Sequence, residues 1–111
     1  MPDEVSENPT DIVRRVEIAG RVLRLELQGE IDVATSPELG EHLRKALLEG
    51  CSSIIVDMAQ VTFLDSSGLR VLVQAASSLS CGYLTIANPT ANVRRVIEIT
   101  ELGDVLRLQS A

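Results

Sequence analysis

Residues 54–69 constrain the fold of this chain more than any other part of the sequence. An apolar strand over 53–58, a short polar turn and the start of a helix follow one another, with Ser66 and Ser67 at the helix start. A continuously apolar strand is expected inside a sheet, with a neighbouring strand along each of its two edges.

The first amides of a helix lack intrahelical acceptors and carry partial positive charge. A hydroxyl there either caps the helix or carries a phosphate that the helix end tolerates. Ser66 is therefore both a candidate cap and a candidate switch.

The residues before this segment predict a β-hairpin. Val16 and Ile18 alternate with charged residues, and a tight turn at 19–20 leads into a second alternating run that contains Leu23, Leu25 and Leu27. Such alternation on both sides of a glycine turn is typical of a hairpin with one apolar face.

Three helices and two further strands complete the predicted order. Residues 35–38 have the spacing of a capping box, so a helix is expected over 36–49, followed by the strand at 53–58. The second helix should run from Ser66 or Ser67 to about residue 80, with Leu69, Leu72, Ala76 and Leu79 facing inward. A strand is expected at 83–87, a third helix that stops near 102–103, and a last strand or short helix at 105–108.

This alternation predicts an α/β fold with two layers. The sheet should be mixed, with four or five strands of which only the first hairpin is antiparallel, and the helices should lie mainly on one face. Residues 1–11 are expected to be a mobile acidic tail and 12–111 one domain. The predicted core contains Leu23, Leu25, Leu27, Ile55, Leu72, Val96 and Ile97.

Composition excludes several classes of function. The formal charge of −6 argues against nucleic acid or an anionic membrane as the partner, because both bind clusters of lysine and arginine. No apolar stretch suits a signal peptide or a membrane span, so a cytoplasmic location is expected. Cys51 and Cys81 are too few for a metal site or a disulfide scaffold; we expect thiols, although a redox link stays open if their helix ends meet. We expect no metal and no cofactor.

Three segments in order resemble the STAS domains, and most closely the stand-alone anti-sigma factor antagonists of bacteria. They are Gly29-Glu30-Ile31-Asp32 with Thr35, the strand-turn-helix segment that ends in Asp65-Ser66-Ser67-Gly68-Leu69, and Asn88-Pro89 with Val93, Val96 and Leu102-Gly103. An Asp-Ser-Ser-Gly match alone is weak, whereas all three segments at these separations are a specific signal.

The resemblance implies a regulated binding protein that is not an enzyme. By this resemblance Ser66 is phosphorylated by a partner anti-sigma factor, a serine kinase of the histidine-kinase-like ATPase fold. The unphosphorylated domain binds that kinase and frees its sigma factor, and a phosphatase that acts on phospho-Ser66 is a further expected partner. The expected partner-binding residues are Asp32, Val33, Thr35, Asp65, Ser66, Ser67, Gly68 and Val71.

Each of these residues also has a purely structural interpretation. Ser66 or Ser67 can serve only as the helix cap, and Asp65 can bind turn amides. Ser67 can also be the modified hydroxyl instead of Ser66. Asp32 or Thr35 can cap the first helix, and Gly68 can be required where helix and sheet approach closely. Val71 and Ala75 lie off the predicted inner face of the second helix, so we expect them to be accessible beside the partner site.

Other functions fit the sequence less well. A serine hydrolase needs a base near Ser66, but the only histidine is His42, on the first predicted helix, and no Gly-x-Ser-x-Gly turn occurs. The sequence lacks a phosphate-binding glycine loop of either common nucleotide-binding type. The stronger alternative is a STAS interaction subunit of a lipid-transport or stressosome complex, in which Ser66 is structural or regulated differently.

Overall fold

The computed structural model describes residues 12–79, 82–100 and 105–109. In this part of the chain one sheet forms in sequence order from β1 (Val13–Ala19), β2 (Val22–Ile31), β3 (Ser53–Leu64), β4 (Leu84–Ala87) and β5 (Arg107–Gln109). Only β1 and β2 pair antiparallel, and every other neighbouring pair is parallel. The predicted mixed sheet is confirmed.

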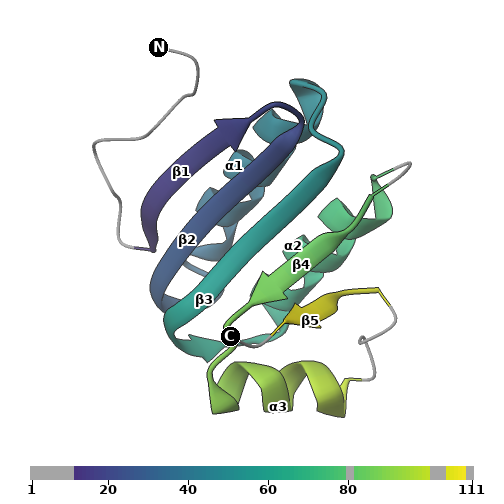
Figure 1. Ribbon diagram of the computed structural model, residues 1–111. Helices are drawn as coiled ribbons and strands as arrows, with labels where there is room; N and C mark the ends of the chain where they lie inside the picture. Colours follow the sequence, from purple (N-terminus) through teal and green to yellow (C-terminus); the bar gives the residue numbers. More distant parts are fainter. Residues whose placement is uncertain (1–11, 80–81, 101–104, 110–111) are drawn as a thin grey trace.

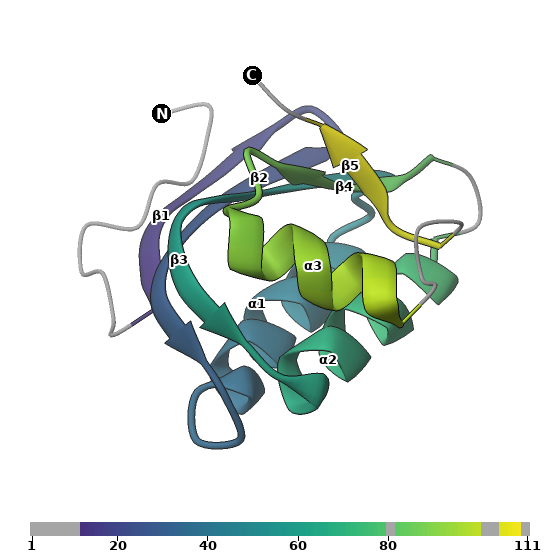
Figure 2. The same ribbon diagram turned by 90° about the horizontal axis from the view of Figure 1, so that it is seen from below.

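The helices α1 (Ser36–Leu48), α2 (Ser66–Ser77) and α3 (Ala91–Ile99) all lie on one face of this sheet (Figure 2). The other face carries none of the helices in the described part of the chain (Figure 1). The alternation in β2 explains this arrangement, because Leu23, Leu25 and Leu27 point to the helices and are at most 1% exposed. Arg24 and Glu26, between them, stay half-buried on the open face.

The core follows the prediction with one clear exception. Leu72 and Ile97 are fully buried as expected, and Val96 is half-buried against the core. Placing Ile55 in the core is wrong, because in β3 it is Ile54 and Val56 that face the helices, and Ile55 lies half-buried on the open face. The strand looks apolar on both sides, but a two-layer fold buries only one face of its sheet.

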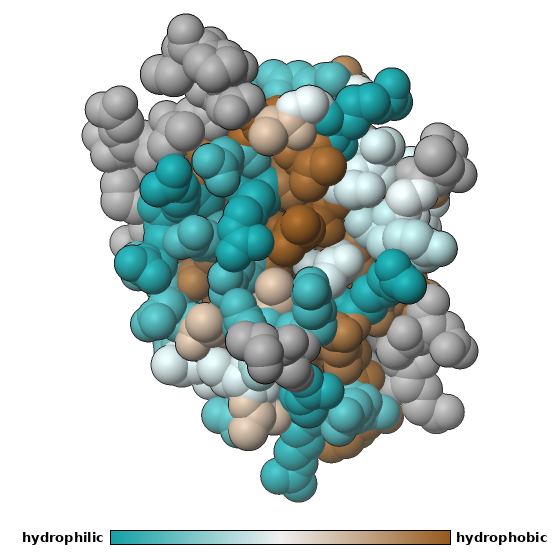
Figure 3. Space-filling view, viewed as in Figure 1, coloured by the Kyte–Doolittle hydropathy of each residue, from teal (hydrophilic) through white to brown (hydrophobic). Residues whose placement is uncertain are grey.

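The open face carries its own polar network around Asp57. The Asp57 carboxylate accepts hydrogen bonds from Arg24 Nη2 at 2.9 Å, Asn88 Nδ2 at 3.3 Å and the Ala59 amide at 3.0 Å. Ile55 is the register partner of Arg24 in β2 and Thr85 in β4. Figure 3 shows apolar atoms on this face bordered by hydrophilic ones.

Several predicted ends shift in the structure. β3 continues to Leu64, beyond the expected end at 58, because Val61 and Leu64 keep facing the core past an irregularity in the pairing with β2. α2 ends at Ser77 and α3 at Ile99, both earlier than expected, and the element expected at 105–108 is a strand, β5, that begins only at Arg107. None of the described helices is long and apolar enough to cross a membrane.

Cys51 is a buried free thiol, and burial raises its pKa. Its suggested partner, Cys81, and the predicted tail at 1–11 lie outside the described residues.

Candidate functional site

The carboxyl ends of β2 and β3 bring the two predicted site segments together. Ile31 and Leu64 are register partners in these parallel strands, and the Asp65 amide donates a hydrogen bond to the Ile31 carbonyl at 3.1 Å. After these partners the chain turns through Asp32 into α1 and through Asp65 into α2. Two segments that are distant in sequence therefore form a single edge, which we call the switch edge (residues 30–36 and 64–71).

Asp65 is the N-cap of α2. Its Oδ1 accepts hydrogen bonds from the amides of Ser67 at 2.9 Å and Gly68 at 3.2 Å, and from the Ser67 hydroxyl. The hydroxyl of Ser67, and after it the two amides, lower the pKa of the Asp65 carboxyl. The interpretation of Asp65 as a group that binds turn amides is confirmed, and the cap interpretation of Ser66 and Ser67 is wrong.

The two serines consequently have different surroundings. Ser67 is half-buried, and its hydroxyl is held by Asp65. Ser66 is the first residue of α2, it is exposed, and its hydroxyl makes no hydrogen bond within the described part of the chain. Of the two serines, Ser66 is the more exposed, and only its hydroxyl makes no hydrogen bond with a described residue.

Asp32 organises the turn between β2 and α1. Its Oδ1 accepts hydrogen bonds from the amides of Ala34 at 3.0 Å and Thr35 at 3.1 Å. The Thr35 hydroxyl donates to the Glu30 carbonyl at 2.9 Å and accepts from the Asp32 amide at 2.9 Å. Because these bonds occupy the hydroxyl, Thr35 stands at the N-cap position without a side-chain cap bond, and the predicted capping box is wrong. The turn also holds Val33 outward, 76% exposed.

Gly68 lies where α2 passes closest to the ends of β2 and β3. A Cβ atom on Gly68 would lie 2.6 Å from Ile31 Cγ2 and 2.7 Å from Leu64 Cδ1. Both neighbours are buried, so neither side chain has space to move away. The prediction that Gly68 permits a close approach is confirmed, and this glycine fixes the position of Ser66 relative to the sheet.

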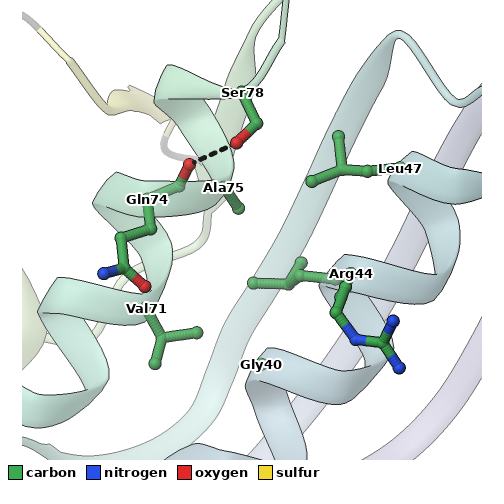
Figure 4. Close-up of a pocket in the computed structure, with 8 residues that line it drawn as sticks. Gly40, Arg44, Leu47, Val71, Gln74, Ala75 and Ser78 are labelled. Carbon is green, nitrogen blue, oxygen red and sulfur yellow. Dashed lines mark hydrogen bonds between the residues drawn. The ribbon is translucent and has the colours of Figure 1, made fainter.

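Val71 lines a shallow groove of about 230 Å³ between α1 and α2, together with Gly40, Leu43, Arg44, Leu47, Gln74, Ala75 and Ser78 (Figure 4). Val71 is half-buried and packs against the core, so only part of it is accessible to a partner. Ala75 is 5% exposed, and the expectation that it is accessible is wrong. The reason is that α2 packs against the sheet and also against α1, so it buries two stripes of side chains.

Two residues of this region were not predicted as part of the site. Phe63 is 47% exposed, precedes Leu64 at the end of β3 and is the register partner of Glu30. In the sequence Phe63 lies between Val61 and Leu64, which both face the core, and this pattern could have indicated that Phe63 faces outward. Arg70 is exposed one turn after Ser66, and it is the only cation among residues 30–41 and 64–71.

Within residues 12–79, 82–100 and 105–109, no group of His, Cys, Asp and Glu side chains is arranged to hold a metal ion. The acidic residues of the switch edge are Glu30, Asp32 and Asp65.

Comparison with known proteins gives consistent matches over most of the chain. The sequence model of the STAS domain matches residues 14–111. The anti-sigma-B factor antagonist of Staphylococcus epidermidis is 34% identical over 82 residues, which are 72% of this chain and 76% of that protein.

Solved structures with the same fold include two anti-sigma factor antagonists. The one from Mycobacterium paratuberculosis has a TM-score of 0.73 at 23% identity, over 98% of this chain and 88% of that one. Unphosphorylated SpoIIAA has a TM-score of 0.74 at 23% identity, over 86% of each chain. The phosphorylated form of SpoIIAA from Bacillus has a TM-score of 0.67 at 22% identity, over 86% of this chain and 89% of that one.

Proposed function

The chain belongs to the STAS domain family, and on that premise we propose that it is an anti-sigma factor antagonist switched by phosphorylation of Ser66. In its unmodified form the switch edge binds an anti-sigma factor that is also a serine kinase, and this binding frees a sigma factor. Phosphorylation of Ser66 ends the complex, and a phosphatase restores the binding form.

The contrast between Ser66 and Ser67 is the observation that carries the proposal. Asp65 caps α2 and holds the Ser67 hydroxyl, so the helix start is stable without any contribution from the Ser66 side chain. The Ser66 hydroxyl is exposed and makes no hydrogen bond with any described residue. A kinase can therefore modify it without breaking the cap.

The modification is a phosphoryl transfer from ATP. The Ser66 Oγ attacks the γ-phosphorus, the bond from that phosphorus to the oxygen bridging it to ADP breaks, and ADP leaves. The hydroxyl proton passes to a base of the kinase. The protein gains about 1.5 to 2 negative charges at neutral pH.

That charge affects docking more than folding. A helix start favours an anion by about 0.3 to 1 kcal/mol, so the fold tolerates the phosphate. At a closed interface the same phosphate has to lose water beside Asp32 and Asp65, and like charges repel. Each tenfold loss in affinity requires only about 1.4 kcal/mol.

The test is to incubate the protein with the candidate anti-sigma kinase and ATP and to map the modified residue. We expect phosphate on Ser66 in the wild-type protein and in Ser67→Ala, and none in Ser66→Ala. Titration calorimetry should show binding of Ser66→Ala to the kinase that ATP does not abolish, and weak binding of Ser66→Asp. Equal affinity of the phosphorylated and unmodified proteins for the kinase would contradict the switch, and would favour a STAS interaction subunit of a non-sigma complex.

A further inference from the structure

We infer that Arg70 is the intramolecular counter-ion of phosphorylated Ser66, so that the phosphate is held along α2 by the side chain one turn further on. This inference rests on the proposed phosphorylation of Ser66. Ser66 and Arg70 both belong to the continuous helix α2, four residues apart. Side chains with this spacing lie on the same face of a helix, and an anion four residues before a cation is the favourable orientation.

The guanidinium of Arg70 is available for this role. Arg70 is exposed, and it forms no ion pair or hydrogen bond with any described residue. Two other arginines are already engaged in ion pairs: Arg24 pairs with Asp57 at 2.9 Å and Arg44 with Glu41 at 3.0 Å. An unpaired arginine loses no existing contact when it turns toward a phosphate.

Arg70 is the only positively charged residue in the two segments 30–41 and 64–71. The other charged residues of segments 30–41 and 64–71 are all acidic, namely Glu30, Asp32, Glu38, Glu41 and Asp65. Two further arginines, Arg94 and Arg95, lie on α3, which packs beside the end of β3, where Asn92 Nδ2 donates to the Thr62 carbonyl at 3.4 Å. Arg94 already contacts Glu98 at 3.9 Å, which leaves Arg95 as the competing candidate.

The pairing changes what the switch edge presents to a partner. Before modification the edge offers an exposed hydroxyl and a free guanidinium. After modification the guanidinium is drawn to the phosphate, so the partner loses a cation at the same time as it meets an anion. Phosphorylation then acts on two charges of the docking surface rather than one.

The experiment installs phosphoserine at position 66 during translation, so that no kinase is needed, and follows the phosphate by ³¹P NMR as a function of pH. We expect the second phosphate pKa to rise by about 0.3 unit in Arg70→Gln, the size expected for one surface pair between residues four apart in a helix. Arg70→Lys should recover part of the shift, and high salt should remove it.

Two control variants remove the same charge elsewhere. Arg21→Gln lies in the hairpin before β2, and Arg95→Gln lies on α3. The 10 residues of β2 separate Arg21 from Asp32, about 30 Å of strand, which is beyond the screening length of physiological salt. Both controls should leave the phosphate pKa unchanged.

A phosphate pKa in Arg70→Gln equal to that in wild type, or a larger shift in Arg95→Gln, would overturn the inference. Either result leaves the kinase experiment unaffected, because the phosphate was placed without the kinase. Conversely, a kinase that fails to modify Ser66 contradicts the proposed function and leaves this titration intact.

Discussion

Gly68 and Ile31 approach so closely that a Cβ atom on Gly68 would lie 2.6 Å from Cγ2 of Ile31. The Asp65 amide bonds the Ile31 carbonyl just before this contact, so the start of α2 is fixed to β2 at two points. Ser66 lies between these two points in the sequence. Its exposed position is therefore set by the packing of the strand ends beneath it.

Gly68→Ala should destabilise the protein because the added methyl group has no space. We expect a loss of about 1 to 3 kcal/mol in the free energy of unfolding, measured by urea denaturation. Ile31→Leu removes the branched methyl that the new Cβ would meet, so it should cost less in the Gly68→Ala background than in wild type. Additive costs of the two substitutions would contradict a direct contact between positions 31 and 68.

Gly40→Ala is the matched glycine substitution and should have the opposite sign. Gly40 lies inside α1, and a Cβ there would lie 3.6 Å from Val71 Cγ1, an ordinary contact. Alanine lowers the entropy of the unfolded chain and favours the helix, so we expect a gain of about 0.4 to 1 kcal/mol. Thermal unfolding should show a rise of several degrees, on the order of 4 to 8 °C per kcal/mol for a domain near this size. A fall in midpoint would mean that α1 and α2 are packed too tightly for the methyl group.

Local sequence patterns determine most of this fold because each element bears a strong signal. Alternation in β2 predicts a sheet covered on one side, and the order of strands and helices predicts parallel pairing. Ile55 and Ala75 differ from their predicted positions because their environments depend on neighbours in space. The open face leaves Ile55 half-buried, and α1 covers Ala75, and neither fact can be deduced from the segment that contains the residue.

The site was predictable to a similar degree. The pairing of segments 30–36 and 64–71 follows from parallel strands that end at the same edge. That Asp65 and neither of the two serines is the cap cannot be predicted from the sequence. All three residues are of types that cap helices well, and only backbone geometry decides between them. Likewise, Thr35 has the correct spacing for a capping box, but its hydroxyl is bonded to the Asp32 amide and the Glu30 carbonyl of the preceding turn instead.

Asp65 should make the stability of the protein depend on pH in the acidic range. Its pKa is lowered in the folded state, chiefly by the Ser67 hydroxyl, so the ionised carboxylate stabilises the fold above the unfolded-state value of about 3.9. This contribution is lost as the pH falls through the lower folded-state pKa. Asp65→Asn keeps a capping oxygen without the charge. The difference in free energy of unfolding between wild type and this variant should therefore shrink as the pH falls from about 5 to about 2.

Asp65→Ala removes the capping oxygen as well and should cost about 0.5 to 2 kcal/mol at neutral pH. Denaturant titrations of the three proteins across this pH range provide the measurement. A deficit of Asp65→Asn that stays constant with pH would show that the charge of Asp65 does not contribute to the cap.

Phe63 and Val33 should contribute to partner binding without contributing to stability. Both are large apolar side chains in or beside the switch edge, 47% and 76% exposed, and burying them at an interface removes apolar surface from water. We expect Phe63→Ser and Val33→Ser each to weaken binding to the anti-sigma factor about tenfold, the equivalent of about 1.4 kcal/mol. Their unfolding midpoints should change little, because neither side chain is part of the core.

Leu48→Ser is the matched control for these two variants. Leu48 is 74% exposed but lies at the last residue of α1, at the far end of that helix from the switch edge. Removal of an exposed apolar side chain there should leave the affinity unchanged, because a partner seated on the strand ends does not reach it. If calorimetry showed the same loss of affinity for Leu48→Ser as for Phe63→Ser, the docking surface would have to extend along α1, and the position of Ser66 alone would no longer explain why one phosphate releases the partner.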